Sequence, residues 1–561
     1  MSATEQNELL RGGQFLVKET ACEDVFTLED LSEEQKMMRD STKEFVDKEL
    51  WAHWERFEKK DYAFTEETMR KAGEMGLLGV AVPEQYGGLG MGFVSTMLVC
   101  DYISGATGSF STAFGAHTGI GTMPITLYGT EAQKQKYVPR LATGEWFGAY
   151  CLTEPGAGSD ANSGKTKAVL SEDGSHYLIS GQKMWISNAG FAEIFIVFGR
   201  IENDKNITAF ILEFDKNNPN GVTLGEEENK LGITSSSTRQ VFFTDTLIPV
   251  ENMLAKRGEG FKIALNSLNV GRIKLGAACT DASRRLITES VKYGNERKQF
   301  KTAISNFGAI QKKYAEMSAK TFALDAGSYR AAKDIQNMID FLLAEGKSHQ
   351  DAELMAFSEY AIECAILKVF GSEVSQFVSD EGIQVFGGMG FSKDTPMESA
   401  WRDARITRIY EGTNEINRLL TVGMLLKKAM KGEIDVITPA TEVGNSLMGI
   451  PSFEVPDFSE LLSEEKAMVA KLKNAFLMVA GKAVQTYGME LESHQQLILA
   501  AAEVMIEVYM AESAILKAEK VANLTSEKEA ECQIAMAKLN LFNAVEKFIF
   551  PINFQSKFCG E

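Results

Sequence analysis

The chain has few cysteines and histidines, and neither residue type is spaced as metal ligands or disulfide partners usually are. Its 561 residues include seven cysteines and five histidines. No CxxC pair and no HExxH motif occurs, so we expect no metal site and no disulfide framework, but free thiols in a reducing compartment. The residues are Cys22, Cys100, Cys151, Cys279, Cys364, Cys532 and Cys559, and His53, His117, His176, His349 and His494.

The sequence also lacks long apolar runs and any stripe of positive charge. No charge-free apolar stretch reaches about 18 residues, which argues against a membrane-spanning helix. The formal net charge is −19, with lysine and glutamate interleaved, which argues against a nucleic-acid partner. The N-terminus, MSATEQNELL, has neither a signal-peptide pattern nor the Arg- and Ser-rich character of a transit peptide. We expect a cytoplasmic bacterial protein, or a mature form in the mitochondrial matrix.

Proline is rare, with 11 residues in the whole chain, and helical periodicity dominates the sequence. Ser32 and Gln35 form a predicted capping box at the start of the first long helix. Short β-rich runs divided by Gly, Asn and Asp turns follow from residue 146, and helical periodicity then returns as in an antiparallel bundle. The predicted order is an N-terminal extension (1–34), a helical domain (35–145), a β domain (146–258) and a helical bundle (259–430).

Two further regions are predicted after the bundle. Prolines and glycines gather in residues 431–458 without a sustained helical period, so this stretch is predicted to be a linker. Apolar spacing at Met468, Leu472 and Phe476 begins another helical domain, over 459–561. Its apolar stripes fit packing faces, but a partner-binding or peripheral membrane face has the same pattern.

The segment AYCLTEPGAGSDANSGKTKA (149–168) is too particular to be explained by folding alone. Thr153 and Ser159 offer hydroxyls in a glycine-containing turn that can approach a flat ring or a polar ligand closely. GQKMWISNAG (181–190) follows it, and Trp185 could lie against such a ring or could be an ordinary core aromatic.

A second segment, IQVFGGMGFSKDTPMESAWRDARITRIYEGTNEINR (383–418), lies late in the bundle and contains Glu411. Glu411 stands between Tyr410 and Gly412. A carboxylate beside an apolar cavity is desolvated, which raises its pKa and suits it to accept a proton. A solvent-exposed glutamate is the competing interpretation, and local sequence does not decide between them.

Both segments, with RKQF (297–300) between them, resemble the signature regions of the acyl-CoA dehydrogenase family in order and spacing across residues 35–425. The resemblance implies an N-terminal helical domain, a middle β-barrel and a four-helix bundle, so the fold class is α+β and mainly α. It also implies FAD as the cofactor and a fatty acyl-CoA as the substrate. Glu411 matches the residue that removes the α-proton, while the β-hydrogen leaves as hydride to flavin N5.

The resemblance assigns further roles residue by residue. It implies substrate contacts at Ser159, Asn269, Arg272, Tyr410 and Gly412, although Asn269 stands where some branches have aspartate. Gly271 occupies the region where two branches keep the catalytic glutamate, which leaves Glu411 without a rival. The implied flavin contacts are Cys151, Leu152, Thr153, Ser159, Trp185, Ile186, Ser187, Thr413 and Glu415, with Arg297, Phe307, Gln384, Gly387 and Gly388 arriving from a neighbouring subunit of a homodimer or homotetramer.

The region after residue 431 resembles the extra domain of the very-long-chain branch. Small residues in GSFSTAFGAHTGIG (108–121), including Gly115, Ala116 and Gly119, could leave room for a long acyl tunnel or could serve close helix packing.

The main hypothesis is α,β-desaturation of a long-chain acyl-CoA to trans-2-enoyl-CoA in fatty acid β-oxidation, with electron-transfer flavoprotein as acceptor. The alternatives are an acyl-CoA oxidase that uses O₂ and a scaffold or assembly protein on the same fold. Retention of Glu411, Arg297 and the TEPGAGSD turn argues against the scaffold.

Overall fold

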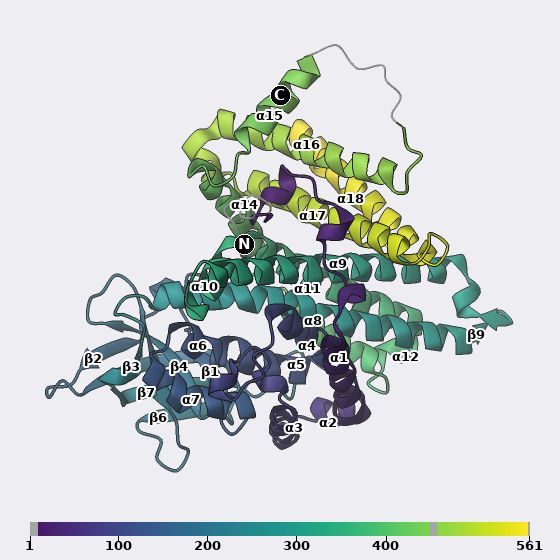
Figure 1. The fold of residues 1–561 in the computed structure, drawn as a ribbon. Coiled ribbons are helices and arrows are strands. Elements are labelled where there is room, and N and C mark those ends of the chain that lie inside the picture. Colours follow the sequence, from purple (N-terminus) through teal and green to yellow (C-terminus); the bar gives the residue numbers. More distant parts are fainter. Residues whose placement is uncertain (1–8, 449–456, 559–561) are drawn as a thin grey trace.

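The computed structural model describes residues 9–448 and 457–558 and is built around long packed helices (Figure 1). Sequence rich in Ala, Leu and Lys with little proline suits helices of this length. The central helices are α8 (Gly260–Glu296), α9 (Gly308–Ala344), α11 (Ala361–Phe386) and α14 (Asn414–Met430). They are connected through the hairpin β9 (Lys298–Gln299) and β10 (Thr302–Ala303), and through α10 (His349–Glu359), α12 (Gly388–Phe391) and α13 (Pro396–Ile406). The predicted mainly helical fold is confirmed.

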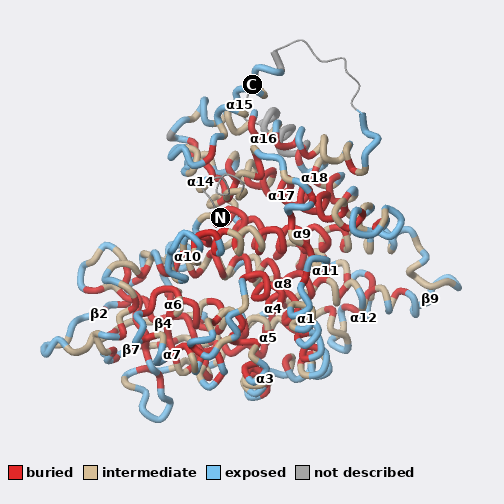
Figure 2. The backbone as a smooth tube through the Cα atoms, in the orientation of Figure 1, coloured by how far each residue is buried: buried red, intermediate tan, exposed pale blue. Residues whose placement is uncertain are grey.

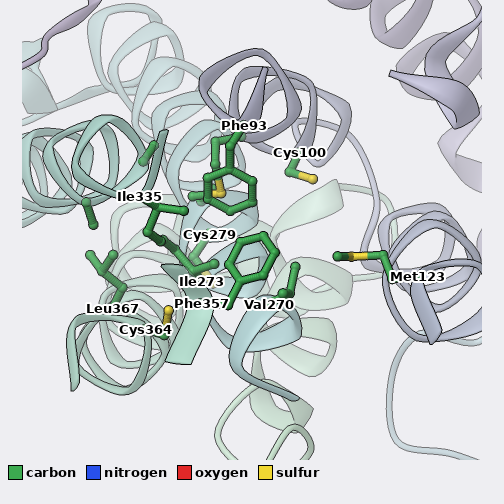
Figure 3. Close-up of a cluster of buried hydrophobic side chains, with 14 of the residues drawn as sticks. Phe93, Cys100, Met123, Val270, Ile273, Cys279, Ile335, Phe357, Cys364 and Leu367 are labelled. Carbon is green, nitrogen blue, oxygen red and sulfur yellow. The ribbon is translucent and has the colours of Figure 1, made fainter. Parts of the chain in front are cut away.

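Helices α8 and α11 approach closely because glycines face each other at their crossing. A Cβ added at Gly276 would lie 2.9 Å from the carbonyl oxygen of Leu367, and one added at Gly371 would lie 3.0 Å from the Cα of Gly276. Around this crossing Ile273, Cys364 and Leu367 gather in one apolar cluster with side chains of neighbouring helices (Figure 3). Burial is concentrated along these helices (Figure 2), so the crossing provides a rigid base for the site described below.

The N-terminal domain packs on the bundle through α4, which contacts α8 and α9. Ser32 caps the first helix as predicted: its Oγ accepts from the backbone N–H of Gln35 at 3.2 Å, and Gln35 Oε1 accepts from the N–H of Ser32 at 3.1 Å. The helices are α1 (Glu33–Phe45), α2 (Trp54–Glu58), α3 (Tyr62–Glu74), α4 (Phe93–Ile103), α5 (Gly108–Gly115), α6 (Met123–Tyr128) and α7 (Glu131–Thr143), with π-helical turns at Val46–Leu50 and Ala116–Gly121.

The predicted middle β domain is an eight-stranded sheet. Its pairing path runs β6-β7-β3-β2-β4-β5-β8, and β1 pairs with β4. The long antiparallel pair of β3 and β7 shifts register between Lys183 and Ile186, where β3 reaches the site. The strands are β1 (Gly148–Cys151), β2 (Lys167–Leu170), β3 (His176–Ser187), β4 (Ile194–Ile201), β5 (Thr208–Glu213), β6 (Val222–Glu227), β7 (Thr238–Pro249) and β8 (Met253–Leu254).

A further helical layer covers α9 on the side away from the sheet (Figure 1). It consists of α16 (Ser463–Tyr487), α17 (Gln495–Leu524) and α18 (Glu531–Phe558). The segment 9–30 lies along this layer: the ring of Phe15 packs edge-on against Tyr509 at 4.9 Å, and Lys473 Nζ donates to the carbonyl of Lys18 at 3.0 Å. The N-terminal extension therefore joins the bundle to the C-terminal helices.

The prediction that the linker 431–458 has no sustained helical period is wrong for residues 437–448. Helix α15 (Ile437–Met448) forms there, with proline tolerated in its first turn, and it packs on α16 where Ala440 faces Gly481. The residues at helical spacing on one side, among them Ala440 and Val443, are half-buried, so the segment does have an amphipathic pattern that the surrounding prolines and glycines outweighed in the prediction. Residues 449–456 of the predicted linker, and Cys559, lie outside the described residues. Among the residues that the structure does describe, no helix is both long and apolar enough to cross a membrane.

Candidate active site

A cavity of about 1010 Å³ lies where the N-terminal helices, the sheet and the bundle meet. Apolar side chains predominate in its lining, and a few polar groups converge on it, as is typical of small-molecule sites. The lining includes residues with small side chains from the N-terminal domain and from α8, namely Gly105, Ala106, Gly108, Gly115, Ala116, Ala278 and Ala282. An added Cβ at Gly115 or Gly119 would meet nothing within 4 Å. Gly119 itself is not among the lining residues.

Glu411 projects into this cavity from the turn between α13 and α14. Its backbone has φ of +57°, an uncommon conformation for a non-glycine residue that often marks functional sites. Its Oε2 is buried without a hydrogen-bond partner in the described residues. Burial raises the pKa of Glu411 to about 7, although Arg272 and Lys368 oppose the shift. The carboxylate is therefore arranged to accept a proton.

The side chain of Glu411 lies directly over α8 at Gly271. A Cβ added at Gly271 would stand 2.5 Å from Oε2 and 2.9 Å from Cδ of Glu411. Glycine at position 271 therefore makes room for the Glu411 carboxylate. It also means that α8 carries no competing carboxylate at this position.

Side-chain N–H donors of α8, α11 and α14 bond to the backbone carbonyls of the Glu411 turn. Arg272 Nε donates to the carbonyl of Glu411 at 3.3 Å, and Lys368 Nζ donates to the carbonyl of Gly412 at 2.7 Å. Asn417 Nδ2 also donates to the Gly412 carbonyl, at 2.8 Å. These bonds satisfy carbonyls that the strained turn leaves outside regular structure.

Lys368 and Asn417 hold the Glu411 turn, and the sequence alone did not identify them. Lys368 comes from α11, 44 positions before the carbonyl it contacts, so no local pattern indicates it. Asn417 lies in the first turn of α14, and its side chain bonds back to the Glu411 turn. An asparagine at the last position of TNEIN (413–417) is the single local signal that could have pointed to it.

The turn that begins at Thr153 forms another wall. Glu154 fixes this turn by accepting from the backbone N–H of Lys165 at 2.6 Å and of Thr166 at 3.0 Å, and by an ion pair with Lys183 at 2.7 Å. Both charged side chains are buried. Burial opposes ionisation, but the Lys183 ammonium keeps the pKa of Glu154 below its ordinary value.

Trp185 lines the same cavity beside this turn. It adopts φ of +59° and leaves 53% of its surface exposed, which is unusual for a tryptophan in a sheet. An exposed aromatic face, the hydroxyls of Thr153 and Ser159, and the unobstructed space beside Gly156 and Gly158 fit a flat cofactor ring. The interpretation of Trp185 as a core aromatic is therefore wrong.

The predicted site residues fall into three groups. The structure brings ten of them to the cavity: Leu152, Thr153, Ser159, Trp185, Ser187, Arg272, Tyr410, Glu411, Gly412 and Thr413. Four others do not line the cavity: Cys151, Ile186, Asn269 and Glu415. Cys151 and Ile186 are buried, and Glu415 is exposed. Asn269 Oδ1 accepts a hydrogen bond from Arg272 at 3.0 Å.

The remaining five predicted residues lie elsewhere on the chain. Arg297, Gln384, Gly387 and Gly388 are exposed and Phe307 is half-buried, all near the hairpin and α12. They do not line the cavity of their own chain. Their expected role toward a neighbouring subunit stays a prediction.

Comparison with known proteins gives the family. Four acyl-CoA dehydrogenase family models match: the N-terminal domain at residues 32–145, the middle domain at 149–246, and two C-terminal domains at 258–425 and 471–551. A Bacillus subtilis protein named "Probable acyl-CoA dehydrogenase" is 42% identical over 525 residues, covering 93% of this chain and 87% of that protein. The chain belongs to the acyl-CoA dehydrogenase family.

The chain is also similar to a mitochondrial enzyme and to a solved bacterial structure. The very long-chain specific acyl-CoA dehydrogenase of Rattus norvegicus is 38% identical over 390 residues, which are 68% of this chain and 55% of the rat protein. A crystal structure of acyl-CoA dehydrogenase complexed with FAD from Bacillus anthracis superposes with a TM-score of 0.92 at 42% identity, covering 97% of this chain and 91% of that chain.

Proposed function

We propose that this chain, an FAD-dependent acyl-CoA dehydrogenase of fatty acid β-oxidation by family, desaturates long-chain acyl-CoA thioesters with Glu411 as the base. The observation that carries the proposal is the buried, unpartnered Oε2 of Glu411, aimed into a cavity large enough for an extended ligand. A carboxylate with a pKa near the working pH is a suitable acceptor for a weakly acidic α-proton.

Thr153, Ser159, Trp185 and Ser187 would hold FAD, because they line the cavity beside the fixed turn described above. When bound, FAD supplies the acceptor for the hydride that leaves the β-carbon. Glu411 holds the α-proton at its carboxylate. The apolar lining excludes water and so preserves the raised proton affinity of that group.

The proposal of a long acyl chain is supported by small residues in the cavity lining. Gly115 and Ala116 line the cavity, and the space beside Gly115 is open. Close helix packing, the alternative role, would bring a neighbour within 4 Å of an added Cβ at Gly115, and none is there. At Gly105 and Gly108 an added Cβ would meet Asp281 and Asp403, so close packing does account for glycine at those two positions. Similarity to the very long-chain relatives agrees with this preference. We further propose a cytoplasmic location, and electron-transfer flavoprotein as the electron acceptor, on the family resemblance.

Anaerobic addition of acyl-CoA to the FAD-loaded protein tests the proposal. Palmitoyl-CoA should bleach the flavin and yield trans-2-enoyl-CoA, and a series of chain lengths should favour long substrates over butyryl-CoA. Absence of bleaching with every chain length would contradict the dehydrogenase activity. Rapid peroxide formation in air, without an acceptor protein, would favour the oxidase instead.

A further inference from the structure

A continuous line of hydrogen bonds and ion pairs connects the C-terminal helices with the Glu411 turn. It starts on α17 at Glu503, whose Oε2 accepts from Arg418 Nη2 at 2.6 Å and from Nε at 2.9 Å. Arg418 lies on α14, the helix that begins in the Glu411 turn. The guanidinium also pairs with Glu373 of α11 at 2.9 Å.

The line continues from Glu373 into the buried side of the turn. Glu373 Oε1 accepts from Asn414 Nδ2 at 3.0 Å, and Asn414 Oδ1 accepts from Lys368 Nζ at 2.8 Å. Lys368 Nζ then donates to the carbonyl of Gly412. Asn414 and Lys368 are 1% and 0% exposed, so neither can replace these partners with bulk water. Each link therefore constrains the next one.

Glu503 is itself fixed within the C-terminal helices. Lys547 Nζ of α18 lies 3.3 Å from Glu503 Oε1 and also pairs with Glu507 of α17. The C-terminal layer thus holds Glu503 in place through Lys547. The Arg418 guanidinium joins two carboxylates from different layers: Nε and Nη2 share one oxygen of Glu503, whereas Nη1 and Nη2 meet both oxygens of Glu373 in the bidentate geometry.

We propose that Glu503 and Arg418 are positioning residues for catalysis, through which the C-terminal helices hold the Glu411 turn and the Lys368 ammonium in place. The inference rests on the proposed function of Glu411. It gives the C-terminal layer a role in proton abstraction in addition to covering α9. Neither residue touches the cavity, so each acts through α14, Asn414 and Lys368.

Two consequences separate positioning from a merely structural role. If the line is broken, the Glu411 carboxylate loses part of its preferred geometry and flavin reduction slows. Burial lowers the pKa of Lys368 to about 7, and Glu411 opposes that shift. In its charged form Lys368 favours the ionised form of Glu411, and it is also less well placed when the line is broken. The pH at which the reduction rate is half-maximal therefore rises, which loss of stability alone would not cause.

The test compares Glu503→Gln with a control on the same helix, Lys520→Met. Lys520 anchors Asp30 at 2.7 Å and has no contact with the turn. With FAD-loaded full-length protein and palmitoyl-CoA, Glu503→Gln should slow anaerobic flavin reduction about 3- to 20-fold and raise the half-maximal pH. Lys520→Met should change neither. A wild-type rate and pH profile in Glu503→Gln would overturn the proposal.

A double-mutant cycle tests whether Glu503 acts through Arg418. Arg418→Gln should slow reduction at least as much as Glu503→Gln, and the double variant should be no slower than Arg418→Gln alone. Effects that multiply would refute the line. If Glu503→Gln folds poorly, Lys368→Met takes its place. Compared with wild type at equal FAD content, this variant should show the same upward shift of the pH profile. Failure of the wild-type protein to reduce its flavin would instead contradict the proposed function.

Discussion

Replacement of Gly271 by alanine should damage catalysis without damaging the fold. The new Cβ would stand 2.5 Å from Oε2 of Glu411, so the carboxylate must move by about 0.9 Å to reach ordinary contact. The atoms that clash belong to the free end of a flexible side chain, and alanine favours the interior of α8 by about 0.5–1 kcal/mol over glycine. The strain is therefore relieved by displacement of the base.

A displacement of about 1 Å at a reacting group can cost about 10²-fold in rate. We expect Gly271→Ala to reduce its flavin about 10²-fold more slowly with palmitoyl-CoA in anaerobic stopped-flow measurements, with FAD content and melting temperature close to wild type. Gly423→Ala on α14, where an added Cβ meets nothing within 4 Å, is the matched control and should keep the wild-type rate. Wild-type kinetics in Gly271→Ala would refute the placement of Glu411 over α8.

Three further predictions follow from the same site. The rate of flavin reduction should rise about tenfold per pH unit below the pKa of Glu411, about 7, and level off above it, because only the ionised carboxylate accepts a proton; a flat profile from about pH 5 to about pH 8 would contradict this. Lys183→Met should lower the free energy of unfolding in urea by about 3–5 kcal/mol and reduce FAD content, since Glu154 stays buried without its cation; unchanged unfolding would show that the pair is dispensable. Gly115→Leu should slow reduction by palmitoyl-CoA more than by butyryl-CoA, and an unaltered chain-length profile would place the acyl chain elsewhere.

Much of the fold could be predicted because local patterns and tertiary structure agree. The Ser32 capping box needs only local contacts, and the strand runs have apolar patterns that also suit their long-range pairing in the sheet, so each forms where the sequence indicates. Helix α15 (Ile437–Met448) was missed because the prolines and glycines of residues 431–458 argued against a helix, although the segment is amphipathic and packs on α16.

The sequence could indicate which residues meet at the site but not what supports them. Motif resemblance pointed to Glu411 and the turn at Thr153, which the structure brings to one cavity, whereas the residues that hold them are distant in sequence. Lys368 reaches the turn from α11, and Glu503 reaches it through Arg418 from a layer that local sequence did not connect with catalysis. Such contacts become visible only when the helices are assembled.

The most direct test of the central claim is anaerobic flavin reduction by Glu411→Gln. Glutamine preserves the size of the side chain and the packing over Gly271 but cannot accept the α-proton. The variant should bind FAD and acyl-CoA, keep its yellow colour, and reduce its flavin at least about 10³-fold more slowly than wild type. Reduction at near wild-type rate would show that another group removes the proton.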